Sequence, residues 1–351
     1  MDILAEYGLF LAKLVTFVVA ALILVVFVFT ASQRGRQYDD EGEIRVLRYN
    51  DQLRDTRETM EAGIRDETSR RRWLKDLRRR RKKEKKNGDH TSASEESTRR
   101  KRMYVIDFKG DIKAGQTGSL KRCVSAILSV AEPEHDEVVV RLESAGGMVH
   151  SYGYAAAQLD RLRQQSLHLT ACVDKVAASG GYMMACVANR IVASPFAILG
   201  SIGVVAQLPN FNRLLKRNDV DFEVLTAGEY KRTLTVFGEN TDKGRKKFRD
   251  DLEETHRLFK QYVSEHRPVV DIDRVATGEI WFGRQALEVS LADELRTSDQ
   301  LLMDACEHKD VFLVHYERPR TLPEKLGLAA ATASESFLMK GADWLRQGRF
   351  Q

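Results

Sequence analysis

An uncharged apolar run near the N-terminus most constrains how this chain can fold. No charged side chain occurs from Leu14 to Ala31, and a run of this length is close to what a helix needs to cross the hydrocarbon core of a bilayer. A cleaved signal peptide would open on basic residues, whereas this chain opens with Asp2 and Glu6. A core helix would keep a polar face, which the run lacks. We therefore predict a membrane anchor over residues 1–32.

The charges beside this run bear on the side of the membrane that holds the rest of the chain. Basic residues follow the run closely at Arg34, Arg36, Arg45 and Arg48, whereas only Lys13 lies near its start. Such an excess favours the cytoplasmic side. Unpaired cysteines agree with a reducing compartment. On the residues alone, the C-terminal bulk is therefore expected in the cytoplasm.

The next stretch, residues 33–102, holds the positive charge of the chain. It carries 23 Lys and Arg against 15 Asp and Glu, although the formal net charge of the whole chain is only +5. Its densest part, RRRWLKDLRRRRKKEKK (Arg70–Lys86), has few residues that could bury a core. We interpret residues 33–102 as a solvated, partly helical spacer that ends in a flexible linker at Asn87–Thr98, with contact to anionic membrane lipid as the alternative. No aromatic interleaving accompanies the charge, so we predict no nucleic-acid partner.

From Met103 onward, short β-branched runs alternate with helical patterns. The predicted strands cover residues 103–109, 137–144, 167–174, 190–194 and 222–228, and the clearest helices cover Gly153–Gln165 and Asp242–Arg267. This alternation predicts an α/β domain with crossover connections. We place that domain at residues 103–305 and treat residues 306–351 as a C-terminal extension.

The cysteines argue against a metal site or a disulfide framework. Cys123, Cys172, Cys186 and Cys306 have neither CxxC spacing nor neighbouring histidine clusters. We expect buried free thiols, no bound metal and no cofactor.

Three glycine-bearing turns follow predicted strands and carry the chemistry. They read ESAGGM (143–148), ASGGY (178–182) and LGSIGV (199–204), and glycine permits close approach of the backbone to a ligand. Ser179 opens a predicted helix, where the positive end of the dipole and the next N–H can stabilise a developing anion. Ser179 is therefore a candidate nucleophile for acyl transfer. The base it needs could be His150, or Lys231 if burial removes the charge of the lysine.

The motifs SAGG, KVAASGGY, GSIGV and GEYKR occur in that order, and together they resemble the signal peptide peptidase A family of serine proteases, peptidase family S49. In that family the serine of S-G-G-Y is the nucleophile and the lysine of G-x-Y-K is the general base. The resemblance therefore implies a dyad of Ser179 and Lys231, whose spacing suits the single-domain form of the family. It further implies that Ser201 orients the lysine, and that backbone N–H groups of Gly146 or Gly147 and of Gly180 form the oxyanion hole.

The same resemblance implies the fold, which is a crotonase- or ClpP-like α/β spiral. The segment Ala276–Leu295 is similar to the family's late segment, where a glycine turn and a helix end the domain. One position departs from the pattern, because the usual S-P-G-G has Ala145 in place of proline. Alanine leaves φ freer than proline does, so we expect a less rigidly held first oxyanion donor.

The implied activity is that of a membrane-anchored serine endopeptidase in the bacterial inner membrane. Its substrates would be peptides or loosely folded segments, including cleaved signal peptides and segments of membrane proteins. Each motif occurs once in this chain, whereas long family members carry two tandem copies. The serine and the lysine of one dyad are therefore expected to come from neighbouring subunits of a homo-oligomer. We predict that this homo-oligomer is an octamer. Family members act on the outer face of the membrane, whereas the basic residues after the anchor favour the cytoplasmic side. The side of the membrane that holds the peptidase domain is therefore not decided by the sequence. The alternatives are a Ser179–His150 hydrolase and a crotonase-like membrane scaffold without activity.

Overall fold

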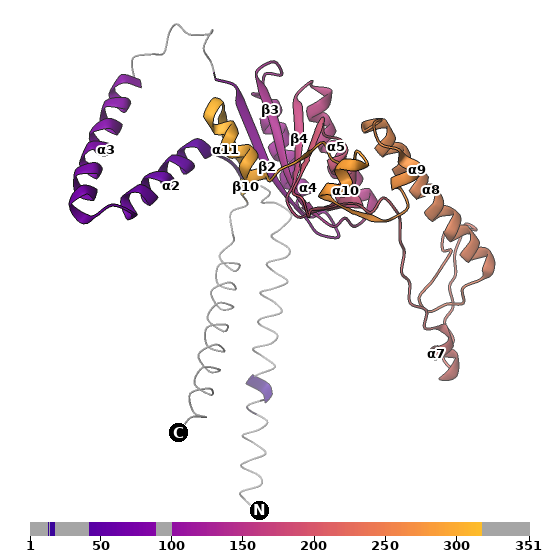
Figure 1. The fold of residues 1–351 in the computed structure, drawn as a ribbon. Coiled ribbons are helices and arrows are strands. Elements are labelled where there is room, and N and C mark those ends of the chain that lie inside the picture. Colours follow the sequence, from indigo (N-terminus) through magenta and orange to yellow (C-terminus); the bar gives the residue numbers. More distant parts are fainter. Residues whose placement is uncertain (1–12, 14, 18–41, 89–99, 318–351) are drawn as a thin grey trace, which may run out of the picture. The chain divides into compact units, whose positions relative to one another are not determined.

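The computed structural model describes residues 13, 15–17, 42–88 and 100–317 (Figure 1). The predicted anchor therefore lies almost wholly outside the described residues, as do most of the predicted linker and residues 318–351. Within the described ranges, no helix is both long enough and apolar enough to cross a bilayer.

A mixed sheet forms the centre of the fold. Its main path runs in the order β1-β10-β2-β3-β4-β6-β9, and the pairs from β10 through β9 are parallel. These strands are β1 (Glu43–Arg48), β2 (Arg102–Gly110), β3 (Asp136–Ser144), β4 (His168–Val173), β6 (Arg190–Ala193), β9 (Glu294–Leu295) and β10 (Asp310–Glu317). Parallel strands need crossover connections, and helices supply them here.

The sheet forks at the end of β3. There Ser144 pairs with Ala177 of β5 (Val176–Ala178). In turn β5 pairs in parallel with β7 (Ile198–Gly200), and β7 pairs in an antiparallel manner with β8 (Ile280–Phe282). This short branch carries the segments that hold the candidate site.

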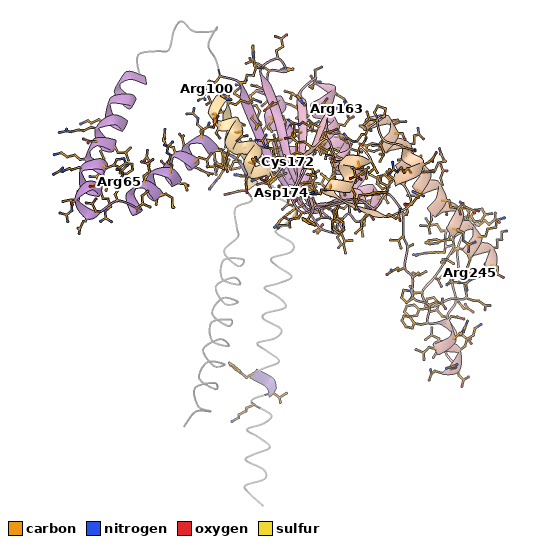
Figure 2. The ribbon with its side chains drawn as sticks, in the orientation of Figure 1. Arg65, Arg100, Arg163, Cys172, Asp174 and Arg245 are labelled. Atoms are coloured by element: carbon orange, nitrogen blue, oxygen red, sulfur yellow. The ribbon has the colours of Figure 1, made fainter. Side chains whose placement is uncertain are left out.

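Helices cover both faces of the main sheet (Figure 1). One face packs against α4 (Thr117–Leu128), α5 (Val149–Gln164) and α6 (Gly180–Ala185) in the larger apolar core. The other face packs against α11 (Ser298–His308) in a smaller core around Val105, Val139 and Leu302. The N-terminus of α11 is fixed by Asp174, which follows β4 and is labelled in Figure 2. Its carboxylate accepts a 2.7 Å hydrogen bond from the Ser298 N–H.

The remaining helices lie along the connections. They are α2 (Tyr49–Gly63), α3 (Glu67–Gly88), α7 (Asn212–Arg217), α8 (Asp242–His266), α9 (Ile272–Val275) and α10 (Gly283–Glu288). Helix α8 begins at a Thr241 cap, whose hydroxyl accepts from the Gly244 N–H. It buries Phe259 and Val263 in the larger core, so the amphipathic helix predicted at Asp242–Arg267 is confirmed.

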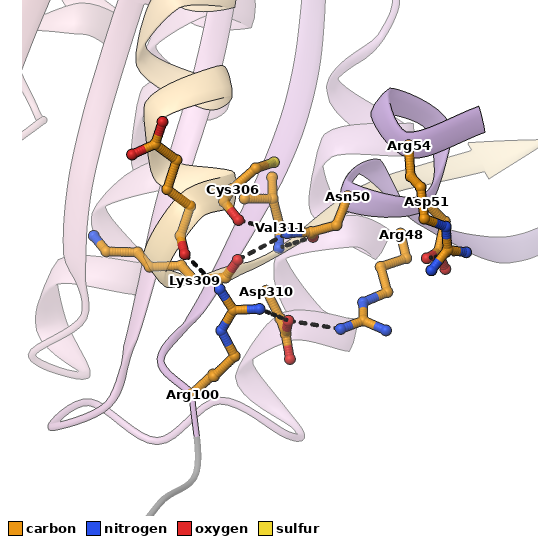
Figure 3. A network of polar contacts seen from close by, with 10 residues as sticks. Arg48, Asn50, Asp51, Arg54, Arg100, Cys306, Lys309, Asp310 and Val311 are labelled. Atoms are coloured by element: carbon orange, nitrogen blue, oxygen red, sulfur yellow. Dashed lines mark hydrogen bonds and ion pairs between the residues drawn. The ribbon is translucent and has the colours of Figure 1, made fainter. Parts of the chain in front are cut away.

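Side-chain hydrogen bonds attach the start of α2 to β10 (Figure 3). The Asn50 amide nitrogen donates to the backbone oxygens of Cys306 (3.2 Å) and Lys309 (2.9 Å), and its oxygen accepts from the Val311 N–H at 2.8 Å. Arg48 pairs with Asp310 at 2.7 Å. Residues from the predicted spacer and from the predicted extension are thus joined within the same sheet.

Two features differ from the sequence-based expectation. The sheet extends past the predicted limits of 103–305, because β1 and β10 belong to it. The strand predicted at 222–228 does not form, and its residues lie exposed outside any regular element. A strand needs a paired neighbour to satisfy its backbone groups, and no other described segment pairs with these residues. The four earlier predicted strands and the helix over Gly153–Gln165 are confirmed.

Candidate active site

Ser179 lies where β5 ends and α6 begins. Its backbone has φ +51° and ψ −120°, and its N–H donates a 2.8 Å hydrogen bond to the Gly200 carbonyl. A positive φ at a residue other than glycine stores strain, and it persists only where surrounding contacts impose it. The side chain is half-buried at the N-terminus of a helix whose residues are all buried. The predicted strand-to-helix turn at Ser179 is confirmed.

The turn after β3 lies directly against this serine. A Cβ placed on Gly146 would lie 2.7 Å from the Ser179 Cβ and 2.7 Å from the Gly180 nitrogen. Gly146 also has φ +92°. Both the close approach and the backbone angle therefore require glycine at this position. The structure thus brings the SAGG and SGG motifs together, although Gly146 and Ser179 are 33 positions apart in the sequence.

The hydrogen bonds of this turn distinguish between the two candidate donors. The Gly146 N–H donates to the Ser144 hydroxyl oxygen at 3.1 Å, and the Met148 N–H donates to the Ile112 carbonyl at 2.8 Å. The Gly147 N–H makes no hydrogen bond to any residue in the described part of the chain. Gly180 is the first residue of α6, where helix geometry leaves the N–H without an intrahelical acceptor. Gly147 and Gly180 are therefore the better pair of free donors.

Ser201 lies beside Ser179 because their strands are paired. Ala178 of β5 is in register with Gly200 of β7, so each serine directly follows a paired residue. Ser201 also has a positive φ, +48°, and its N–H donates to the Glu279 carbonyl at 2.7 Å. Its side chain is half-buried.

Lys231 is not brought to this site within the single chain. It lies in a turn of the 203–241 segment, which has one short helix, α7, and its side chain is exposed. Among the described residues, no hydrogen bond joins its ammonium group to Ser179 or to Ser201; its own backbone N–H bonds the Gly228 carbonyl at 3.1 Å. The described part of the chain therefore leaves Lys231 exposed.

The 203–241 segment exposes an unusual amount of apolar surface. Leu225 is 90% exposed and Val205 is 80% exposed. A hollow of about 470 Å³ in this segment is lined mainly by apolar and aromatic side chains, among them Phe222, Val224 and Phe237. Contiguous apolar surface of this kind typically marks a contact with another molecule.

His150, the alternative base, is exposed in the first turn of α5. No hydrogen bond within the described ranges joins its ring to Ser179. The same ranges contain no cluster of His, Cys, Asp or Glu that could hold a metal ion. Cys123, Cys172 and Cys186 are buried free thiols, and burial raises the pKa of the Cys186 thiol to about 12, which makes it a poor nucleophile.

Sequence reasoning missed two side chains behind the glycine turn. Ser144 is buried at the end of β3, and Tyr152 is buried on α5. Their oxygens lie 2.6 Å apart. Ser144 is the first residue of the SAGG motif, but the motif gave it no role of its own. No motif or residue spacing indicated a role for Tyr152.

Family models match nearly the whole chain. Residues 2–159 match the model described as Peptidase family S49 N-terminal, and residues 161–312 match the model described as Peptidase family S49. The chain belongs to peptidase family S49. It is therefore a peptidase, and the family inferred from its glycine, serine and lysine motifs is confirmed.

Two curated relatives match more than nine tenths of the chain. A Haemophilus influenzae protein described as "Probable protease SohB" is 50% identical over 333 residues, which cover 94% of this chain and 93% of the relative. A Buchnera aphidicola subsp. Acyrthosiphon pisum protein of the same description is 45% identical over 340 residues, which cover 97% and 98%. Among solved structures, a mutant of the 1510-N membrane-bound stomatin-specific protease matches with a TM-score of 0.40 and 12% identity, over 63% of this chain and 100% of that chain.

Proposed function

We propose that this S49 peptidase is a membrane-anchored serine endopeptidase with Ser179 as nucleophile and Lys231 as general base. The observation that carries the proposal is the strained turn at Ser179, which faces the Gly146–Gly147 turn across a contact that admits no side chain. Strained backbone concentrates at catalytic positions. The forked sheet, in which β3 pairs with both β4 and β5, supports the crotonase- or ClpP-like spiral.

In this mechanism the neutral Lys231 amine takes the proton of the Ser179 hydroxyl as its oxygen attacks the substrate carbonyl. The N–H groups of Gly147 and Gly180 stabilise the resulting oxyanion. Collapse of the intermediate breaks the C–N bond, and the lysine returns the proton to the leaving amine. Water then hydrolyses the acyl-enzyme by the same route. Ser201 holds the lysine amine in line with the nucleophile.

The exposure of Lys231 supports a dyad completed by a neighbouring subunit. The 203–241 segment carries both Lys231 and the exposed apolar surface, so docking on a second copy of the chain would bury both together. Burial lowers the pKa of a lysine because it disfavours the charged form. We propose a closed homo-oligomeric ring, with eight subunits as the expected number, in which each segment reaches the next subunit's serine.

Mixing two inactive variants tests this arrangement. Ser179→Ala and Lys231→Ala are each expected to abolish hydrolysis of an unstructured peptide by the detergent-solubilised protein. Co-expressed at equal amounts in one ring, they should recover about one quarter of the wild-type activity, because half of the serines and half of the lysines are intact and pair at random around the ring. No recovery in a verified mixed ring contradicts the shared dyad. A His150→Ala variant that is inactive would instead assign the base to the histidine.

The proposed partners are peptides or loosely folded protein segments and the lipid of the bacterial inner membrane. Helix α3 supports the lipid contact, because Arg72, Lys75 and Arg79 are exposed along it and anionic headgroups attract such residues. Flotation with vesicles that contain anionic lipid, compared with neutral vesicles, tests this contact. Activity of a C-terminal reporter that functions in only one compartment decides on which side the peptidase domain lies.

A further inference from the structure

We propose that Tyr152 is a positioning residue for the oxyanion hole, acting on both of its donors. This inference rests on the proposed function, since it assigns Tyr152 a role in the site of Ser179. Tyr152 is fully buried on the inner face of α5. Its ring packs edge-on to Phe108, with the ring centroids 6.5 Å apart. The tyrosine therefore reaches the site from the larger apolar core, with no surface exposed to solvent.

Its hydroxyl belongs to a chain of hydrogen bonds with only one possible direction. The Gly146 N–H can only donate, and it donates to the Ser144 oxygen at 3.1 Å. The Asp111 carbonyl can only accept, and it accepts from the Tyr152 hydroxyl at 2.7 Å. Each hydroxyl has one proton, so the 2.6 Å contact between Ser144 and Tyr152 must have the serine as donor. Every proton is used, and successive hydrogen bonds polarise and strengthen one another.

This series of hydrogen bonds fixes Gly146, the residue that precedes the first oxyanion donor, Gly147. The Gly146 N–H is held by the Ser144 oxygen, and the next N–H, that of Gly147, has no acceptor among the described residues, so it remains available for an oxyanion. Ala145 stands in this turn where the family pattern has proline, so ring closure does not restrain φ here. Instead, the hydrogen bonds through Ser144 and Tyr152 restrain this turn by holding the Gly146 N–H.

The ring of Tyr152 supports the second donor. A Cβ placed on Gly180 would lie 2.4 Å from the ring Cγ, so the Gly180 backbone rests directly on the aromatic ring. A Cβ on Gly110 would lie 2.3 Å from the Tyr152 oxygen, and one on Gly181 would lie 2.4 Å from the Ser144 carbonyl oxygen. Three glycines thus leave the space that the tyrosine and serine occupy. The two glycines of the SGG motif, Gly180 and Gly181, therefore allow this packing.

The test is Tyr152→Phe, which keeps the ring and removes only the hydroxyl. Loss of an entire oxyanion donor lowers kcat about 100- to 1,000-fold, so a donor that is loosened but retained should lower kcat about tenfold. We expect KM to change by less than about twofold, because ground-state contacts are untouched. A peptide boronate, which mimics the tetrahedral intermediate, should bind about tenfold more weakly. Rates are normalised to active sites titrated with a fluorophosphonate, which separates slower catalysis from misfolded protein.

Ser144→Ala provides a second variant that breaks the same chain by removing one buried oxygen. It should lower kcat about as much as Tyr152→Phe, and the double variant should be no slower than either, because both changes act through one set of bonds. Ser298→Ala is the matched control: it removes a buried hydroxyl that donates to Asp174 on the other face of the sheet. It should lower the melting temperature and leave kcat per active site unchanged.

The outcomes separate this inference from the proposed function. If the enzyme is active, loses activity in Ser179→Ala and keeps its full kcat in Tyr152→Phe, the positioning role is refuted and the dyad stands. A rise in KM with unchanged kcat also refutes it, because the tyrosine would then serve substrate binding. If Ser179→Ala keeps its activity, the proposed function fails and this inference fails with it.

Discussion

Replacing Gly146 by alanine tests whether the turn after β3 must touch Ser179. Two costs arise in the folded state. A φ of +92° strains a residue with a Cβ, by about 1–2 kcal/mol. The new Cβ would also meet the Gly180 nitrogen and the Ser179 Cβ, each at 2.7 Å, and such overpacking costs roughly 1–3 kcal/mol. We therefore expect the free energy of unfolding to fall by about 2–5 kcal/mol.

Gly146→Ala should also lower kcat, because the new Cβ would clash with Ser179, the nucleophile, and with the Gly180 nitrogen, a candidate oxyanion donor. Gly278→Ala is the matched control: its φ is +85°, so it carries similar strain, but nothing lies within 4 Å of the position that its Cβ would occupy. Melting temperature and kcat per titrated active site are measured for both variants. The control should lose only the strain component and should keep its kcat. Equal losses of kcat in the two variants, or an active Gly146→Ala enzyme, would refute the proposed contact.

Three further predictions concern the rest of the molecule. Asn50→Ala removes three hydrogen bonds to the α11–β10 connection and should lower the free energy of unfolding by about 2–3 kcal/mol, seen as a lower urea midpoint. Burial raises the pKa of the Cys172 thiol from 9.0 to about 12. The stability that this thiol contributes should be complete below about pH 9 and be lost as the pH rises towards about 12, because only the unfolded chain then forms a thiolate; Cys172→Ala should flatten that decline in thermal melts. Cys306, which is half-buried, should react with a maleimide in the native protein before Cys172 does, as mass spectrometry of the labelled peptides would show.

The central strands could be predicted from the sequence because each is a local pattern. Strands β2, β3, β4 and β6 are short β-branched runs, and helix α8 has clear amphipathic spacing. Pairing between distant segments has no such local signal. Nothing in residues 43–48 indicates that they lie beside residues 310–317, and the link depends on side chains such as Asn50.

The candidate site was predictable only as far as its motifs extend. The turn at Ser179 and its proximity to Gly146 follow from glycines placed after strands. The strand expected at 222–228 was wrong because its residues have no pairing partner among the described residues, whatever their β propensity. The role of Tyr152 was not predicted, because the sequence pattern of a buried aromatic residue on a helix is the same as that of an ordinary core residue. Its role depends on two glycines, Gly110 and Gly180, that leave room for it and lie in other segments.

The position of β10 has a consequence for the way this protein is made. The last described strand lies between the first two, β1 and β2, so a nascent chain cannot complete the sheet until the ribosome has synthesised residue 317 and released it from the exit tunnel. Until then β2 has an open edge, and the core under α11 lacks Val311 and Leu313. Contacts between segments so far apart in sequence form late. A prematurely terminated product would therefore present the unpaired edge of β2, which can pair with another chain and lead to aggregation.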